Sequence, residues 1–171
     1  MNRYIILLRG VNVGGNNILP MKELKYLLES NSFENVAYYI QSGNLVLRGD
    51  NHPEKKIADL IEAKFDFRPE VLALTESEFN LAVVNCPYQE YEGKFVHFYF
   101  CKQTPTIDNT KLLALVAETE QYELIDNVFY LHAPDGIGRS KLVANIESFL
   151  GVSATGRNLN SIKKLYQMVA K

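Results

Sequence analysis

The chain has 171 residues, of which 47% are hydrophobic and 22% are charged. This composition is ordinary for a globular protein and excludes a disordered chain. The formal net charge is −2. Dedicated nucleic-acid-binding proteins neutralise phosphates with clustered lysine and arginine, so this balance disfavours nucleic acid as a partner, although a local basic patch would still be compatible with it.

The ends and the cysteines of the sequence indicate an intracellular, cytoplasmic protein. The apolar run Tyr4–Leu8 is interrupted by Arg9 and is too short for the core of a signal peptide. No apolar run approaches the length of a membrane span. Cys86 and Cys101 have neither CxxC spacing nor a nearby histidine pair, so they indicate no zinc site and no disulfide framework. We expect no metal and no cofactor.

The first half of the chain predicts the order β-α-β-β-α-β. Tyr4–Leu8 is a continuous apolar run, typical of a strand buried on both faces. Thr75 and Glu78 have the spacing of a capping box at the start of a further helix. The other expected elements are a helix from Pro20 to about Asn31, strands at 36–40 and 45–47, a helix opened by Pro53 and a strand at 70–74.

The second half repeats this order without a visible sequence repeat. We expect strands at 95–101, 122–125 and 128–131, helical residues at 112–117, a helix over 140–150 ended by Gly151, and a last helix at about 158–169 in place of a fourth strand. The prediction is therefore an α+β fold, a duplicated ferredoxin-like (βαββαβ) plait with two halves in one chain. The halves span 1–75 and 94–171, and residues 76–93 connect them.

Two loops rich in glycine and asparagine are expected at one end of the first sheet. Because a right-handed crossover makes strands one and two parallel, Arg9–Asn17 and Gln41–Asn44 should emerge together. One interpretation is that backbone N–H groups converge there on an anion, with Arg9 supplying charge and Asn12 or Asn17 supplying donors. The other is that tight turns need positive φ angles, which glycine and asparagine tolerate. Neither loop has a phosphate-loop or G-x-G-x-x-G pattern, and both interpretations stay open.

Two further segments carry candidate binding residues at predicted helix starts. Residues 135–141 bring Arg139 and Lys141 to a helix start where Ser140 can act as N-cap. Residues 155–164 combine arginine, asparagine and lysine at the start of the last helix. The plainer interpretation of the first segment is a Gly-rich loop with Ser140 as an ordinary N-cap, and that of the second is a capped helix with a solvated basic face.

Catalytic patterns are poorly represented. His52, His97 and His132 are scattered, and His97 alternates with Phe95 and Tyr99 in a strand, where a histidine more often packs than acts as a base. There is no Ser-His-Asp pattern, no HExxH motif and no carboxylate pair that can be placed together. Whether the protein is an enzyme stays open.

Four stretches of the chain resemble a bacterial family known as domain of unknown function 1697. They are LLRGVNVGGNN (Leu7–Asn17), YIQSGNLV (Tyr39–Val46), GRSKL (Gly138–Leu142) and TGRNLNSIKKL (Thr155–Leu165). The resemblance implies a two-part ferredoxin-like fold and no established activity. Together with the loop argument, its characteristic positions give the expected ligand-binding residues: Arg9, Asn12, Gly14, Gly15, Asn17, Ser42, Gly43, Asn44, Ser140, Lys141, Arg157 and Asn158.

Three hypotheses about function follow from these observations. The first is binding of a small anionic ligand, a nucleotide or another phosphate compound, by the Gly/Asn loops and Arg9. The second is a nucleic-acid or protein interaction module that uses Arg139, Lys141, Arg157 and Lys163. The third is an enzyme of unidentified reaction, which needs a buried titratable group near these loops.

Overall fold

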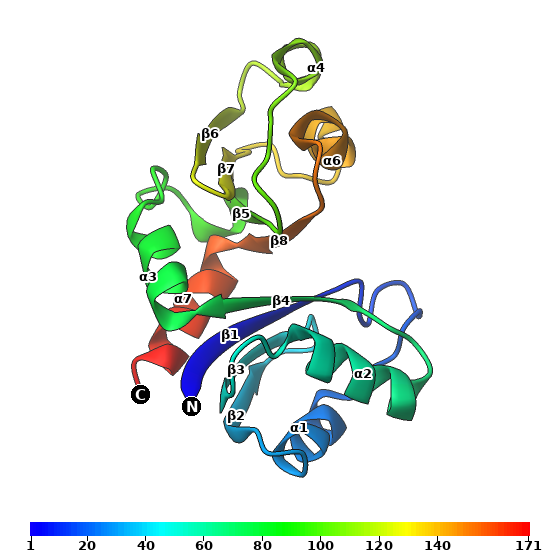
Figure 1. The fold of residues 1–171 in the computed structure, drawn as a ribbon. Coiled ribbons are helices and arrows are strands. Elements are labelled where there is room, and N and C mark those ends of the chain that lie inside the picture. Colours follow the sequence, from blue (N-terminus) through cyan, green and yellow to red (C-terminus); the bar gives the residue numbers. More distant parts are fainter. The chain divides into compact units, whose positions relative to one another are not determined.

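The computed structural model describes residues 1–171, which divide into two compact units. The first unit is Met1–Val83 together with Lys163–Lys171, and the second is Val84–Ile162. Each unit contains one four-stranded antiparallel sheet with helices (Figure 1). The predicted α+β class is confirmed, and two units with one sheet each are consistent with the predicted two-half organisation. The bounds 1–75, 76–93 and 94–171 stay a prediction. Each unit is described separately below.

The first unit follows the predicted element order. Its elements are β1 (Asn2–Arg9), α1 (Met21–Glu29), β2 (Glu34–Tyr39), β3 (Asn44–Gly49), α2 (Glu54–Phe65), β4 (Glu70–Thr75) and α3 (Glu76–Val84). The strand order in the sheet is β2-β3-β1-β4, and all neighbours are antiparallel. Since β1 and β2 both run opposite to β3, they point the same way, as the sequence predicts.

Helices α1 and α2 pack on one face of this sheet and bury its apolar side chains. Burying one such side chain contributes about 1.5–3 kcal/mol to folding. The side of each helix that faces the sheet is therefore apolar, and the spacing of leucine and isoleucine in the sequence predicts both helices. Strand β1 is buried along all of Tyr4–Leu8, so the expectation of a strand covered on both faces is confirmed. The core beneath the helices includes Tyr4, Ile6, Leu8, Leu24, Leu28, Leu45, Leu47, Ile57, Ile61 and Val71.

The predicted capping box at the start of α3 is present. The backbone N–H of Glu78 donates to Thr75 Oγ1 at 3.1 Å, and the backbone N–H of Thr75 donates to Glu78 Oε1 at 3.0 Å. Two helix N–H groups that would otherwise lack acceptors are satisfied reciprocally.

The second unit repeats the topology of the first. Its elements are η1 (Gly93–Phe95), β5 (Val96–Cys101), α4 (Asn109–Leu115), β6 (Gln121–Ile125), β7 (Val128–His132), α5 (Lys141–Ala144), α6 (Ile146–Leu150) and β8 (Ala154–Asn158). The strand order is β6-β7-β5-β8, again antiparallel throughout. Helix α7 (Leu159–Val169) follows β8, and its residues from Lys163 onward belong to the first unit. The helix-covered core includes Tyr99, Cys101, Leu112, Phe129, Leu131, Leu142 and Phe149.

The absence of a fourth strand in the second half was a wrong prediction. Residues 154–158 form β8, which pairs with β5 from Cys101↔Ala154 to His97↔Asn158. The segment reads Ala-Thr-Gly-Arg-Asn and lacks the apolar alternation by which strands are recognised. Its glycine has a packing reason, because a Cβ at Gly156 would lie 2.7 Å from Cε1 of Tyr99.

Two helix boundaries also differ from the prediction. Helix α4 ends at Leu115, so residues 116 and 117 lie outside it. The single helix expected over 140–150 is divided into α5 and α6 at Asn145, whose φ is −122°. The Asn145 side chain donates to the backbone oxygen of Lys141 at 2.8 Å, and such local bonds compete with helix continuation. Gly151 ends α6 with a φ of 73°, as expected.

No helix of the chain is both long enough and apolar enough to cross a membrane. The cytoplasmic location stays a prediction. Both cysteines are buried, and neither forms a disulfide.

The first testable prediction concerns Gly43. Its φ is +85°, and a Cβ there would lie 2.8 Å from Cβ of Leu8 and 2.9 Å from Cγ2 of Val11. Gly14 also has a positive φ, of +58°, but a Cβ there would meet nothing within 4 Å. We expect Gly14→Ala to lower the free energy of unfolding by about 1 kcal/mol through backbone strain. Gly43→Ala should cost about 1–3 kcal/mol more through overpacking. Urea denaturation of the full chain measures both, and equal losses would contradict the packing argument.

Candidate functional site

The two Gly/Asn loops of the first unit lie in direct contact. The backbone N–H of Leu8 donates to the backbone oxygen of Gly43 at 2.8 Å. The side chain of Asn12 donates through Nδ2 to the backbone oxygen of Gln41 at 2.6 Å. The expectation that residues 9–17 and 41–44 are neighbours is therefore confirmed. We call these two segments together the loop pair.

The longer member of the loop pair is a miniature β-hairpin. Its backbone N–H groups of Asn12 and Asn16 donate to the oxygens of Asn17 and Val13, at 3.0 and 2.9 Å. Gly14 and Gly15, at the tip, have φ angles of 58° and 77°. Two successive positive φ angles inside a two-residue hairpin loop are the mark of a type I′ turn, which strongly prefers glycine. The turn alone thus accounts for both glycines.

The asparagine side chains of the loop pair hold its conformation. Asn12 donates to the backbone oxygen of Leu19 at 2.9 Å and accepts from the backbone N–H of Leu19 at 2.7 Å. Asn17 donates to the oxygen of Gly10 at 3.0 Å. Asn44 is fully buried and donates to Oγ of Ser42 at 2.8 Å. These amides are structural, and each such bond contributes about 1 kcal/mol.

Arg9 carries the positive charge of the loop pair and forms an ion pair. Its Nη1 lies 3.3 Å from Oε2 of Glu70, which is its direct partner on β4. The two side chains are 37% and 31% exposed. Any anionic ligand of Arg9 therefore has to compete with Glu70.

Backbone strain and exposed apolar side chains also gather at the loop pair. Ile40 has a φ of 50°, which is unusual for a β-branched residue. It is 50% exposed, while Val13 and Ile18 are 63% and 59% exposed. Strained backbone often accompanies ligand sites. Sequence reasoning did not single out Ile40, because isoleucine carries no turn signal.

The remaining predicted site residues lie in the second unit. Ser140 accepts from the backbone N–H of Val143 at 3.2 Å as the N-cap of α5 and donates to Oε2 of Glu120 at 2.7 Å. Asn158 accepts from the backbone N–H of Ser161 at 3.0 Å at the start of α7. Lys141 is exposed on the first turn of α5.

Arg157 lies on the sheet face opposite to Asn158. It pairs with Phe98 in the ladder, while Asn158 pairs with His97. Its Nη1 donates to the backbone oxygen of Gly156 at 2.8 Å. Burial lowers the pKa of Arg157 to about 10. The predicted residues of the second unit therefore fall on two faces of its sheet.

His97 is the functional candidate that sequence reasoning passed over. Its side chain is 7% exposed, and Nε2 has no hydrogen-bond partner. Burial lowers its pKa, so the neutral imidazole is favoured. Its location in an aromatic strand predicted burial, but the missing partner is visible only in the coordinates. Cys101 on the same strand is not an activated thiol, since burial raises its pKa to about 11.

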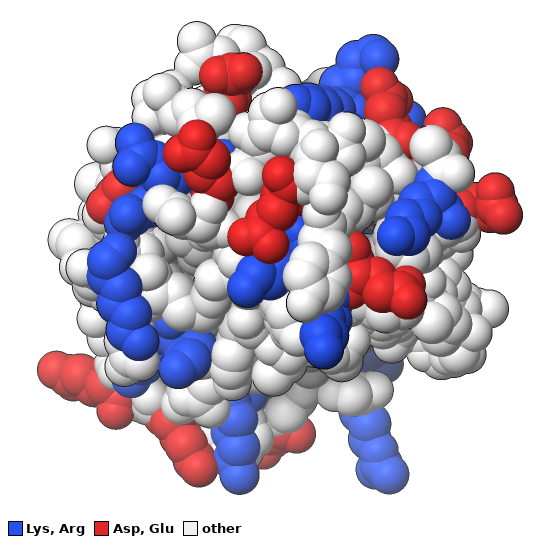
Figure 2. Space-filling view, turned by 90° about the horizontal axis from the view of Figure 1, so that it is seen from below, with Lys and Arg blue, Asp and Glu red and all other residues white.

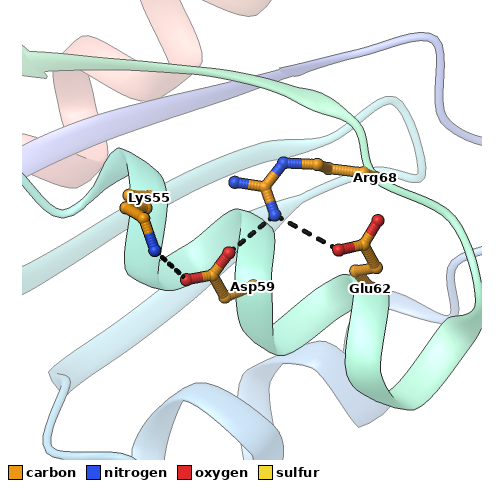
Figure 3. Close-up of polar contacts among 4 residues, drawn as sticks. All are labelled: Lys55, Asp59, Glu62 and Arg68. Atoms are coloured by element: carbon orange, nitrogen blue, oxygen red, sulfur yellow. Dashed lines mark hydrogen bonds and ion pairs between the residues drawn. The ribbon is translucent and has the colours of Figure 1, made fainter.

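A separate charged cluster covers α2 in the first unit. Lys55 Nζ lies 2.8 Å from Asp59, whose other oxygen lies 2.6 Å from Arg68 Nη1, and Arg68 also reaches Glu62 at 3.4 Å (Figure 3). The pKa of Asp59 is lowered by its hydrogen bonds from Lys55 and Arg68. Beside this cluster is an open depression of about 410 Å³. None of the predicted site residues lines it: its walls are His52, Lys55, Lys56, Asp59 and Leu60.

Comparison with known proteins places the chain in a family. A family model described as a protein of unknown function, DUF1697, matches residues 1–130. The chain belongs to the DUF1697 family. The resemblance seen in the sequence is thereby confirmed, and the matched range of this DUF1697 protein contains the whole loop pair.

Among solved structures, the DUF1697 protein is similar to the conserved bacterial protein SP0830 from Streptococcus pneumoniae. The two chains are 24% identical, with a TM-score of 0.71 and 98% of each chain covered. At this level of identity, the likeness shows a shared fold. A comparison with curated proteins gave no match.

The second prediction concerns the pH dependence of stability. Burial lowers the pKa of both His97 and His132, so the unfolded chain binds protons that the folded chain does not. Stability should be full above the ordinary histidine pKa of about 6.5 and should fall as the pH drops below it. We expect His97→Phe to flatten this slope in urea denaturation at several pH values. His52→Gln, which changes an exposed histidine, is the control, and an unchanged slope in His97→Phe would refute the assignment.

Proposed function

We propose that this DUF1697 protein binds a small phosphate-bearing ligand, such as a nucleotide or a sugar phosphate, at the loop pair of the first unit. The observation that carries the proposal is that segments distant in sequence are fixed against each other by the 2.6 Å hydrogen bond from Asn12 to Gln41. A rigid platform of loops loses little conformational entropy when a ligand binds.

Access to the backbone supports this proposal. Gly14 and Gly15 lie exposed at the tip of the hairpin, and a Cβ at either position would meet nothing within 4 Å. A phosphate can therefore approach the N–H groups of the turn closely, as phosphates do at other glycine-rich turns. The requirement of the type I′ turn for glycine and this access are compatible.

The ion pair of Arg9 with Glu70 indicates how the loop pair would hold a phosphate. A guanidinium group binds phosphate through parallel N–H donors, more strongly than it binds a partly solvated carboxylate. The pair at 3.3 Å is about one-third exposed, and exposed pairs are worth little. We infer that the phosphate displaces Glu70 from Arg9.

We also infer that each of the two units is a ferredoxin-like plait. The strand orders β2-β3-β1-β4 and β6-β7-β5-β8 support it, because each results from a β-α-β-β-α-β chain. The nucleic-acid alternative has less support. On the face drawn in Figure 2, Asp and Glu side chains lie among the Lys and Arg side chains, which adjoin one another only along its left edge.

The third prediction tests the proposal with three variants. A thermal-shift screen of the full chain against nucleotides and sugar phosphates should find a stabilising ligand. Arg9→Ala should weaken its binding by about tenfold or more, since a charge-assisted hydrogen bond is lost. Glu70→Gln should strengthen it, because the competing carboxylate becomes neutral. Arg68→Ala, which removes a paired arginine between α2 and β4, is the matched control.

Each shift is measured against the same variant without ligand, so that any change of basal stability cancels. The proposal fails if no compound of the screen stabilises the wild-type chain. It also fails if Arg9→Ala binds as well as Arg68→Ala does.

A further inference from the structure

Three branched apolar side chains are exposed around the loop pair. Val13 lies in the longer loop, Ile18 directly follows that loop, and Ile40 directly precedes the shorter one. They are 63%, 59% and 50% exposed, and we call them the apolar group. Apolar side chains scattered singly over a surface need no explanation, whereas several in one place mark contact with another molecule. Their significance therefore depends on whether they lie together.

Hydrogen bonds of Asn12 bring two members of the apolar group together. Val13 directly follows Asn12 in the chain. The Asn12 side chain donates to the backbone oxygen of Leu19 at 2.9 Å and accepts from its N–H at 2.7 Å. Ile18 directly precedes Leu19, and consecutive Cα atoms are only about 3.8 Å apart. Both apolar residues are therefore held close to Asn12.

The third member joins the same place at a cost in backbone energy. Asn12 also donates to the backbone oxygen of Gln41 at 2.6 Å, and Ile40 directly precedes Gln41. The φ angle of Ile40 is 50°, in the left-handed region that β-branched residues rarely adopt. Asparagine would relieve this strain and would suit the exposure. Contact with an apolar part of a ligand accounts for an isoleucine that is both strained and exposed.

The apolar group adjoins the arginine that the proposed function uses. Asn17 donates through Nδ2 to the backbone oxygen of Gly10 at 3.0 Å. Arg9 directly precedes Gly10, and Ile18 directly follows Asn17. The arginine and a member of the apolar group thus flank the same hydrogen bond. One small molecule can therefore contact both.

Two exposed amide side chains accompany the apolar group. Gln41 follows Ile40, and Asn16 is bridged to Val13 across the hairpin. Neither amide side chain forms a hydrogen bond within the chain. A nucleobase fits this combination, because its flat face is apolar and its edge carries donors and acceptors that amides can pair with. A sugar, which is covered by hydroxyl groups, offers no comparable apolar face.

We propose that the phosphate-bearing ligand of the loop pair is a nucleotide, whose phosphate is held at Arg9 and whose base rests on the apolar group. This inference rests on the function proposed for the loop pair and selects one of the two ligand classes named there. The base covers the exposed apolar side chains, and Asn16 and Gln41 bind its polar edge.

The experiment separates the base from the phosphate with compounds that share one sugar phosphate. Isothermal titration calorimetry of the full chain compares the four ribonucleoside 5′-monophosphates with ribose 5-phosphate, which lacks the base. At least one of the nucleotides should bind about tenfold or more tightly than ribose 5-phosphate, because the base buries apolar surface. Arg9→Ala should weaken the binding of both kinds of compound, since both carry the phosphate.

Variants of the apolar group separate nucleotide binding from folding. Ile40→Asn should raise the free energy of unfolding, because asparagine tolerates a left-handed φ, and yet weaken nucleotide binding by about fivefold. Val13→Ser should weaken nucleotide binding similarly. Neither substitution should change the affinity for ribose 5-phosphate. Leu113→Asn, which changes a leucine on α4 that is 66% exposed, is the matched control and keeps the wild-type affinities.

Equal affinities for ribose 5-phosphate and the nucleotides, all weakened in Arg9→Ala, would overturn this inference and leave the proposed function standing. Nucleotide affinities that stay unchanged in Ile40→Asn and Val13→Ser would also overturn it. If no nucleotide binds, the inference is wrong, whereas ribose 5-phosphate and the wider screen decide the proposed function. Sedimentation equilibrium tests for another occupant: a wild-type oligomer that Ile40→Asn dissociates would make the apolar group an interface between copies, against the inference.

Discussion

The double-sided burial of β1 is the constraint on which the first unit depends. Residues Tyr4–Leu8 are all buried, and β1 pairs with both β3 and β4. A one-residue slip would turn every side chain of the strand to the opposite face and disrupt both ladders. The register therefore determines that Arg9 stands opposite Glu70 and that the N–H of Leu8 reaches Gly43. The contact between the two loops is a consequence of how this strand is buried.

Most elements were predictable because their signals are local. The apolar period of α1 and α2, the capping box of Thr75 and Glu78, and the stop at Gly151 depend on a few neighbouring residues. Strand β8 was not predictable in this way. Its five residues carry little apolar alternation, and what makes them a strand is the ladder to β5, which is distant in the sequence. Tertiary pairing overrides local propensity there.

The candidate site was likewise predictable only in part. Chain direction alone predicted that the two loops of the first unit would be neighbours, and they are. The use of each polar side chain could not be predicted, because an asparagine that binds a ligand and one that braces a loop have the same sequence signature. Asn12 and Asn17 brace the hairpin, and Arg9 has an ion-pair partner on β4. The absence of a partner for His97 likewise depends on every side chain packed around it.

Glycines illustrate how coordinates change a functional argument. Gly14 is explained by the left-handed angle of its turn, and Gly156 by the ring of Tyr99 packed against it. Gly138 has neither reason. In sequence these positions look alike, and glycine-rich stretches suggest ligand contact equally at all of them. Once turn geometry and packing have accounted for Gly14 and Gly156, neither glycine is by itself evidence of ligand contact, and Gly138 is the one of the three that the fold leaves unexplained.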